Sequence, residues 1–312
     1  MIAATIADGR IAPAEHPDPE PGAGEVLVRV AAAGLNGADL HQLAGRYPAP
    51  AGSPPDIPGL ELAGVVAAAG PGATRFALGA RVMGIVGGGG QAELAVVHER
   101  QLVAVPDELD LIAAGGVPEV FTTAYDALFT QCALAPGERL LVHGGAGGVG
   151  TAAIQLGVAT GARVHATVRD PGLRDGVAAL GAIVLAPEEF TAHGPFDVIL
   201  ELVGAPNLPG DLESLAPCGR VVVIGIGGGA VGEIDLRTLM AKRATLRASM
   251  LRARALEEKA LTARALERSV LPLLASGQVA VSVAATYPLA DVAAAYERFA
   301  AGSKLGKIVL VC

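Results

Sequence analysis

The chain has 312 residues, of which 52% are hydrophobic and 17% charged, and its formal net charge is −8. This composition is typical of a globular protein with a large core and excludes a disordered chain. The negative balance argues against a general surface for nucleic acid or for anionic membranes.

Targeting and membrane patterns are absent from the sequence. No uninterrupted apolar run approaches the ~18 residues that a transmembrane helix needs, and the N-terminus has no basic segment followed by an apolar one. The cysteines are Cys132, Cys218 and Cys312, and their scattered positions indicate neither a disulfide framework nor a zinc knuckle. We therefore expect a cytoplasmic protein with reduced thiols and no membrane contact.

Residues 1–108 alternate short β-like runs with glycine and proline. Period-2 alternation is clear over 25–30, and many short strands with frequent turns predict a mainly-β domain of barrel or sandwich type. The four glycines at 87–90 are either a mobile loop or turn or a plain hairpin connection, and the hairpin connection is the preferred interpretation.

From residue 109 the pattern changes to alternating helices and strands, which predicts a doubly wound α/β domain over 109–254. Helical runs at 109–114 and 122–131 lead into it. The six expected strands are 140–143, 163–168, 182–185, 197–202, 220–225 and 245–250.

The last segment, 255–312, is expected to return to the β-rich domain and so to make that domain discontinuous. An amphipathic helix is predicted over 256–274 and a short one over 289–300. Strands are predicted at 279–283 and 307–311.

The stretch 137–155, GERLLVHGGAGGVGTAAIQ, contains a G-x-G-x-x-G pattern between an expected strand and an expected helix. The first glycine, Gly145, permits a tight turn. The second, Gly147, lets a pyrophosphate approach the backbone, and the third, Gly150, lets the helix pack on the strand. The helix N-terminus offers unpaired N–H groups to the phosphates. We therefore predict a dinucleotide site on the backbone of Gly145, Ala146, Gly147, Gly148, Val149 and Gly150.

The end of the second strand indicates which dinucleotide binds. A carboxylate there suits the ribose of NAD, but the tip reads Thr167, Val168, Arg169. A guanidinium suits a 2′-phosphate, so we predict NADPH, with Thr167 at the strand tip, Arg169 as the main contact and Arg174 as a second one. The alternative is that Arg169 is only a solvated turn residue and Asp170 binds the ribose.

The ends of later strands should complete the coenzyme site, because ligands of open α/β sheets bind beyond the carboxyl ends of the strands. Backbone groups that follow the fourth and fifth strands are expected to hold ribose and carboxamide; these residues are Val203, Gly204, Gly225, Ile226 and Gly227. No chemistry is assigned to His98, His143 or His165, and His143 is expected in the core.

Several segments together resemble the zinc-independent quinone oxidoreductase branch of the medium-chain dehydrogenase/reductase superfamily over nearly the whole length. They are GERLLVHGGAGGVGTAAIQ (137–155), GLNGADLHQLAGRYP (34–48), PGLELAGVV (58–66), PEVFTTAYDAL (118–128) and LGKIVL near the end. Val158 departs from the pattern, where a basic residue is usual. The resemblance implies a Rossmann domain, a GroES-like catalytic domain and a homodimer, and the edge strand at 245–250 suits sheet extension across that dimer.

Zinc ligands are missing where zinc-dependent relatives carry them. Those relatives carry a cysteine in the segment that matches 34–39, which reads GLNGAD here, and a histidine in a G-H-E triplet, where this chain has Leu60; no cysteine precedes Cys132. Because catalytic zinc needs about three protein ligands, we predict no metal. A metal held by His41, Glu61 and Asp39 is the alternative.

The resemblance implies that Asn36, Asp39 and Tyr47 line the substrate cleft. Asn36 would donate to the nicotinamide ribose or the substrate, and the Tyr47 phenol would donate to the acceptor. His41 is either a proton relay or a solvated histidine, and Asp39 has an equal structural interpretation as a helix cap. Thr123 is expected near the nicotinamide, with a backbone-bonded threonine as the alternative.

These residues predict an NADPH-dependent reductase of quinones or of α,β-unsaturated carbonyls, in which positioned donors stabilise developing negative charge. An enoyl-thioester reductase would share the coenzyme site and need a pocket for a carrier arm. A binding protein with a structural or sensing role would keep the coenzyme site without turnover.

Overall fold

The computed structural model describes residues 1–312, and the chain divides into two compact units. The β-rich unit comprises Met1–Thr122, Leu251–Gly302 and Lys307–Cys312, and the Rossmann unit comprises Thr123–Met250 and Ser303–Gly306. The first boundary thus lies at 122 where the sequence indicated 108, and the chain returns to the β-rich unit at 251 rather than 255. Residues 303–306 belong to the Rossmann unit, which no sequence pattern indicated.

The β-rich unit contains a two-stranded hairpin, a seven-stranded sheet and five helices. Its strands are β1 (Ile2–Ala7), β2 (Arg10–Glu15), β3 (Glu25–Gly34), β4 (Glu61–Ala69), β5 (Arg81–Ile85), β6 (Leu94–His98), β7 (Leu102–Ala104), β14 (Val283–Pro288) and β15 (Lys307–Val311). Its helices are α1 (Gly37–Leu43), α2 (Leu111–Ala114), α8 (Leu256–Ser269), α9 (Leu271–Ala275) and α10 (Val292–Ala300).

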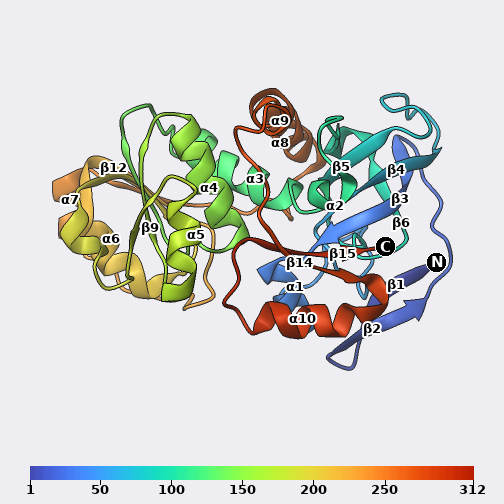
Figure 1. The fold of residues 1–312 in the computed structure, drawn as a ribbon, viewed down its shortest axis with the longest axis horizontal. Coiled ribbons are helices and arrows are strands. Elements are labelled where there is room, and N and C mark those ends of the chain that lie inside the picture. Colours follow the sequence, from blue (N-terminus) through green and yellow to red (C-terminus); the bar gives the residue numbers. More distant parts are fainter. The chain divides into compact units, whose positions relative to one another are not determined.

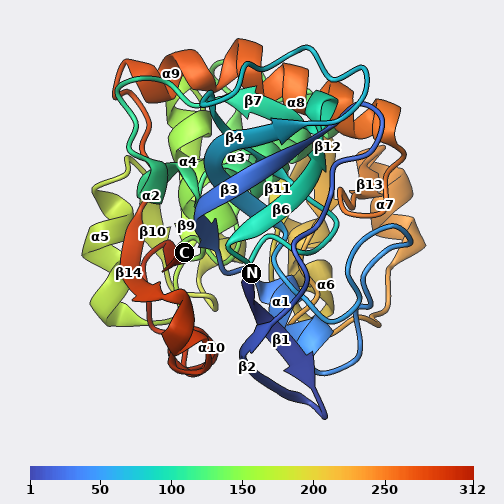
Figure 2. The same cartoon turned by 90° about the vertical axis from the view of Figure 1, so that its right-hand side faces the viewer.

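Alternation in β3 builds the centre of this unit. Val26, Val28 and Val30 point into one core with Leu62 and Val82, whereas Arg29 is exposed. The sheet order is β14-β15-β3-β4-β5-β7, and β6 also pairs with β3. The C-terminal strand β15 pairs with β3, so the tail returns to the β-rich unit. Figure 2 shows α8 lying across β7.

Three details of this unit differ from the sequence expectations. The residues 87–90 do not join a hairpin, because β5 pairs with β4 and β7 whereas β6 pairs with β3. The helix expected over 256–274 is two helices, because Pro272 lacks the N–H that would continue α8. The strand expected at 279–283 begins only at Val283.

The Rossmann unit is a six-stranded parallel sheet in the order β10-β9-β8-β11-β12-β13. Its strands are β8 (Arg139–Val142), β9 (Arg163–Thr167), β10 (Ile183–Leu185), β11 (Phe196–Glu201), β12 (Leu215–Val223) and β13 (Thr245–Ala248). Its helices are α4 (Gly148–Ala159), α5 (Arg174–Ala178), α6 (Leu208–Ser214) and α7 (Leu236–Lys242), and α3 (Pro118–Tyr125) contains the boundary between the units.

Numbered within the sheet, this order is 3-2-1-4-5-6, the doubly wound arrangement whose direction reverses between the first and fourth strands. All six predicted strands are present, each within a few residues of its expected bounds. Figure 1 shows α4 and α5 on one face of the sheet and α6 and α7 on the other. The reversal lies between β8 and β11, so the carboxyl ends of these two strands mark the expected ligand crevice.

None of the helices combines the length and the apolar character that crossing a bilayer requires.

Candidate functional site

Asp39 is a buried cap at the start of α1. Its Oδ2 accepts the backbone N–H of Asn36 at 2.8 Å, and its Oδ1 accepts that of Gly59 at 3.3 Å. Gln91 Nε2 donates to Oδ2 at 3.2 Å. Burial raises the pKa of Asp39 to about 6, against the lowering effects of the Asn36 hydrogen bond and of Lys307. The bond to Asn36 makes Asp39 the acidic partner of a capping box at the start of α1. The bonds from Gly59 and Gln91 join this helix start to two other segments of the unit.

The side chain of Asn36 is bonded within the β-rich unit. Its Nδ2 donates to Gly34 O at 3.2 Å and to Glu61 Oε1 at 3.0 Å, and its Oδ1 accepts Lys307 Nζ at 2.7 Å. An amide has two N–H donors, and here both are used. Donation from Asn36 to a ribose or a substrate would require one of these bonds to be exchanged.

Glu61 is the centre of a buried charged cluster. Lys307 Nζ lies 2.6 Å from its Oε1, and the backbone N–H of Glu119 donates to its Oε2 at 2.8 Å. Burial raises the pKa of the Glu119 side chain to about 8, with the nearby Glu61 carboxylate adding to the effect and Lys307 opposing it. Glu119 is therefore mostly a neutral carboxylic acid at pH 7.

Tyr47 is half-buried, and its ring lies 4.8 Å from the guanidinium carbon of Arg252. Arg252 also donates to Tyr47 O at 3.1 Å, to Gln42 Oε1 at 2.6 Å and to Gly87 O at 2.7 Å. Burial raises the pKa of the Tyr47 phenol, and Arg252 opposes that shift. Arg252 thus holds the segment that carries Tyr47. Sequence reasoning missed it, because no local pattern distinguishes this arginine from its neighbours.

His41 is half-buried, and its Nδ1 lies 3.4 Å from a guanidinium nitrogen of Arg46. His41, Asp39 and Glu61 do not form a group of potential metal ligands. The carboxylate oxygens of Asp39 and Glu61 accept the hydrogen bonds described above. Leu60, at the position where a histidine would be needed, is buried.

The glycine loop is crowded at two of its three motif glycines and open at the third. A Cβ at Gly145 would lie 2.9 Å from that of Ala166, and one at Gly150 would lie 2.4 Å from Gly144 O, so larger residues would clash at both positions. At Gly147 the nearest atom would be 3.4 Å away, which leaves room for a ligand beside the backbone. Gly147 is also the N-cap residue of α4, and no side chain caps it. The N–H groups of the first turn therefore face outward, with Ala146, Gly148 and Val149 partly exposed around them.

The three charged residues at the tip of β9 differ in their hydrogen bonds. Arg169 is exposed and has no hydrogen bond to another residue, whereas Arg174 Nε donates to Val168 O at 3.2 Å. Asp170 accepts Gly172 N at 2.9 Å, and hydrogen bonds from the Ser303 side chain and from Gly172 lower its pKa. Asp170 is therefore engaged in its own turn, whereas the Arg169 guanidinium is exposed beside it and its charge also lowers the Asp170 pKa.

The ends of β11 and β12 carry backbone that only glycine tolerates. Gly204 has φ +123°, and a Cβ there would lie 2.5 Å from Gly229 O. At Gly225 a Cβ would lie 2.2 Å from Leu202 O. Of the remaining candidates, Val203 is half-buried, and Ile226 and Gly227 are exposed. The buried hydroxyl of Thr123 has no partner, and an orphaned polar atom fits a group that a bound ligand would satisfy.

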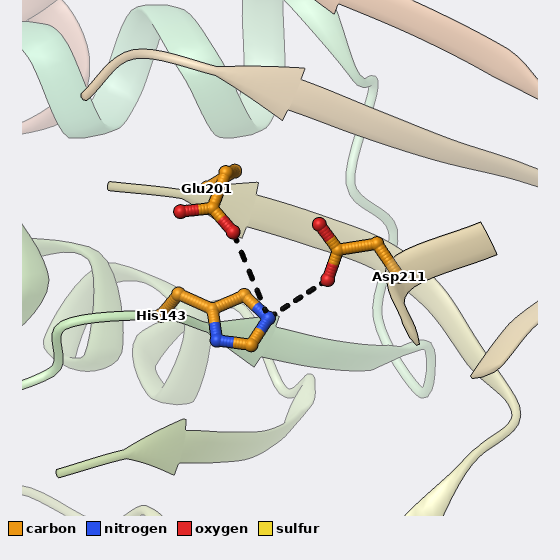
Figure 3. A group of neighbouring side chains, drawn as sticks. All are labelled: His143, Glu201 and Asp211. Carbon is orange, nitrogen blue, oxygen red and sulfur yellow. Dashed lines mark hydrogen bonds and ion pairs between the residues drawn. The ribbon is translucent and has the colours of Figure 1, made fainter. Parts of the chain in front are cut away.

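A buried histidine lies between two carboxylates directly below the loops of the Rossmann unit. His143 Nε2 lies 2.8 Å from Asp211 Oδ1 and 3.9 Å from Glu201 Oε2 (Figure 3). Their ligand atoms lie within 4.8 Å of one another. Its other nitrogen, Nδ1, is 3.0 Å from Thr167 Oγ1, so Thr167 contacts His143 rather than the surface where a coenzyme contact was predicted.

Residues 303–306 are a part of the site that sequence reasoning missed. Gly306 N donates to Ala146 O at 2.8 Å, and Gly306 pairs with Gly147 in a parallel bridge. The Ser303 side chain bonds Asp170. A segment remote in sequence thus supports both the glycine loop and the tip of β9.

Two family models match the chain. Residues 22–107 match the alcohol dehydrogenase GroES-like domain, and residues 181–310 match the zinc-binding dehydrogenase model. The three cysteines are free, and none belongs to a group of possible metal ligands. The zinc implied by the second model therefore finds no fitting set of ligands in the β-rich unit.

Curated relatives are of two kinds. Human quinone oxidoreductase is 31% identical over 306 residues, covering 92% of this chain and 89% of that protein. The pikromycin polyketide synthase component PikAII of Streptomyces venezuelae is 38% identical over 225 residues. That match covers 68% of this chain, which spans only 6% of the length of the synthase.

Solved structures agree with the fold along the whole chain. The native structure of mycobacterial Rv1454c complexed with NADPH has a TM-score of 0.87 at 28% identity and covers 100% of both chains. A thermostable alcohol dehydrogenase from Pyrobaculum aerophilum has a TM-score of 0.87 at 30% identity, covering 100% of this chain and 99% of its own. With its GroES-like and Rossmann units, the chain belongs to the quinone-oxidoreductase-like branch of the medium-chain dehydrogenase/reductase superfamily.

Proposed function

We propose that this protein is an NADPH-dependent oxidoreductase that reduces a quinone or an α,β-unsaturated carbonyl compound without zinc. The observation that carries the proposal is the cradle at the carboxyl end of β8. There Gly147 leaves open space beside the uncapped N-terminus of α4, which suits a pyrophosphate. The NADPH-bound mycobacterial neighbour and the quinone oxidoreductase relatives support the same assignment.

The preference for NADPH rests on the tip of β9. The Arg169 guanidinium is exposed, whereas Asp170 already accepts hydrogen bonds from Gly172 and Ser303. An exposed guanidinium binds a 2′-phosphate through charge-assisted hydrogen bonds. A carboxylate engaged in its own turn is poorly placed to accept the ribose hydroxyls of NADH.

Bound NADPH would supply the hydride, and the chain would supply orientation and a proton donor. The Tyr47 phenol is the donor that we assign to the acceptor oxygen, because it is half-buried and a phenol is protonated at neutral pH, and burial raises its pKa further. Arg252 holds the backbone of Tyr47 in place. Asn36 and Asp39 support this surface through their internal bonds, and His41 remains a candidate proton relay.

Absence of zinc is part of the proposal. In the β-rich unit the Lys307 ammonium already lies against Glu61 and Asn36, so a cation at this point would meet a charge of the same sign. No step of the reaction requires a metal here.

An enoyl-thioester reductase is the second candidate, favoured by the 38% identity to polyketide synthase segments from two Streptomyces species. NADPH oxidation with phenanthrenequinone, with a simple enone and with crotonyl-CoA separates the possibilities. Turnover of the quinone or the enone supports the leading proposal, and turnover of crotonyl-CoA alone supports the second. Tight NADPH binding without reduction of any acceptor would leave a binding protein with a structural or sensing role.

We also infer a homodimer and a cytoplasmic location. Strand β13 lies at an edge of the Rossmann sheet, and Leu236 and Met240 of α7 are 65% and 75% exposed. An unpaired edge with apolar neighbours suits pairing with a second copy. Light scattering on the purified protein tests the dimer.

The free cysteines fit a reducing compartment.

A further inference from the structure

His143 is a buried polar residue at the point where the Rossmann sheet reverses direction. It directly follows β8 and precedes the glycine loop, and it is 1% exposed. Glu201, at the end of β11, and Asp211, in α6, are both fully buried beside it (Figure 3). Burial of three polar side chains is costly unless they form hydrogen bonds, and such buried networks hold the segments that they join in fixed positions.

One side of the imidazole contacts the glycine loop through Thr167. The Thr167 hydroxyl lies 3.0 Å from His143 Nδ1 and accepts the N–H of Gly144 at 3.4 Å. If the hydroxyl donates to Nδ1, then Nε2 carries the ring proton and donates to Asp211 Oδ1 at 2.8 Å. With this assignment both ring nitrogens form hydrogen bonds, and the Thr167 hydroxyl acts both as a donor to Nδ1 and as an acceptor of the Gly144 N–H.

The other side of the imidazole faces the loop that follows β11. Glu201 Oε2 lies 3.9 Å from Nε2 and accepts Asn207 Nδ2 at 2.9 Å. Glu201 Oε1 accepts the N–H of Gly204 at 2.7 Å and also that of Val203. The Glu201 carboxylate thus lies beside His143 and also fixes the Val203–Gly204 turn, where a coenzyme contact is proposed.

We propose that His143 is a positioning residue of the coenzyme site, holding the start of the glycine loop and the Val203–Gly204 turn in a fixed relation. This inference rests on the proposed binding of a nicotinamide coenzyme. Because the network holds backbone shared by both coenzymes, its loss affects NADPH and NADH equally. We expect an increase of about tenfold in both dissociation constants, the change that follows when the coenzyme loses about one hydrogen bond to the displaced backbone.

The cluster is held by direct hydrogen bonds rather than arranged as a metal site, and among its four carboxylate oxygens only Asp211 Oδ2 has no partner. The distance of 2.8 Å between Nε2 and Asp211 Oδ1 is that of a direct hydrogen bond. Both Glu201 oxygens already accept N–H donors. A cation would have to displace these bonds.

The test uses two substitutions that each keep half of the network. The amide of His143→Asn reaches the position of Nδ1 and keeps the Thr167 contact, whereas that of His143→Gln reaches the position of Nε2 and keeps the Asp211 contact. His165→Asn is the matched control, because His165 is also buried in this unit, packs on Phe196 and has no partner at Nδ1. Dissociation constants for NADPH and NADH come from fluorescence titration, and stability from thermal unfolding without ligand.

Both His143 variants should raise the two dissociation constants about equally, whereas His165→Asn should lower stability and leave them unchanged. The inference fails if folded His143 variants bind both coenzymes as tightly as the wild type, or if the control weakens binding to the same extent. Stoichiometric metal in the purified protein that is lost in Asp211→Asn would also overturn it.

A second pair of variants decides the matter if the His143 variants do not fold. Thr167→Val removes the hydroxyl at nearly constant shape and should weaken both coenzymes, and Thr167→Ser should restore binding. Equal binding by the two would contradict the inference. If the wild type binds neither NADPH nor NADH, the proposed function fails instead.

Discussion

The Lys307 ammonium lies 2.6 Å from Oε1 of Glu61, and the two side chains are 3% and 0% exposed. Lys307 also donates to Leu35 O and Asn36 Oδ1, each at 2.7 Å. All three ammonium donors are therefore used inside the β-rich unit. Their partners belong to the segment that enters α1 and to the first residue of β4, so this pair organises the surface that carries the candidate residues.

Removing one partner of this pair should be more harmful than neutralising both. Lys307→Met leaves the Glu61 carboxylate buried and unpaired, and we expect a loss of about 3–5 kcal/mol in the free energy of unfolding. The double variant Lys307→Met/Glu61→Gln should recover part of that loss, because the carboxylate that lost its ammonium partner is then neutral. Urea denaturation measures both, and a double variant no more stable than Lys307→Met would contradict this account.

Stability of the protein should fall as pH rises from about 5 to 8 because of Glu119. Its pKa is raised to about 8, above the ordinary value of 4.5, so in this range the folded state binds a proton that the unfolded state has lost. The contribution is complete below pH 4.5 and lost above pH 8, for a total on the order of 5 kcal/mol. Glu119→Gln should flatten this part of the stability profile in denaturation experiments at several pH values. An unchanged slope would show that other groups cause it.

Arg169→Ala should weaken NADPH far more than NADH. One charge-assisted interaction contributes about 1.5–3 kcal/mol, which corresponds to a factor of roughly 10–100 in the dissociation constant. Arg163→Ala is the control, because Arg163 is exposed at the opposite end of the same strand. Equal losses for the two coenzymes would exclude Arg169 as the 2′-phosphate contact.

Tyr47→Phe should lower kcat by a factor of about 100 or more, as expected for the loss of a proton donor. Binding of NADPH should not change. Tyr287→Phe, in β14 of the same unit, is the control for removing a tyrosine hydroxyl. Because the Tyr47 pKa is raised, the wild type should keep its activity to higher pH than an ordinary phenol would allow. A variant with wild-type kcat would remove Tyr47 from the mechanism.

Local pattern was sufficient for most elements of the fold. The six strands of the Rossmann sheet and the glycine loop follow from apolar runs, glycine spacing and alternation, because backbone geometry and burial of one face are local constraints. Local pattern was insufficient where the structure depends on which strands pair with each other. The residues 87–90 resemble a hairpin turn, but β5 and β6 have other partners.

For the candidate site, residue types were predictable and their partners were not. Gly145, Gly147 and Gly150 were recognisable because backbone approach demands glycine at fixed spacing. Asn36 was recognisable as a candidate, but its amide meets Lys307, 271 positions away. His143 similarly meets Asp211 across 68 positions.

The sequence by itself determined the fold class, the coenzyme loop and the lack of cysteine and histidine at the expected zinc positions. Only the tertiary structure decided that Lys307 neutralises Glu61, that Ser303 engages Asp170 and that His143 links two loops. The reason is physical. Propensity and periodicity state which face of an element is buried, whereas a buried polar group is satisfied by whichever segment the fold brings within about 3 Å of it.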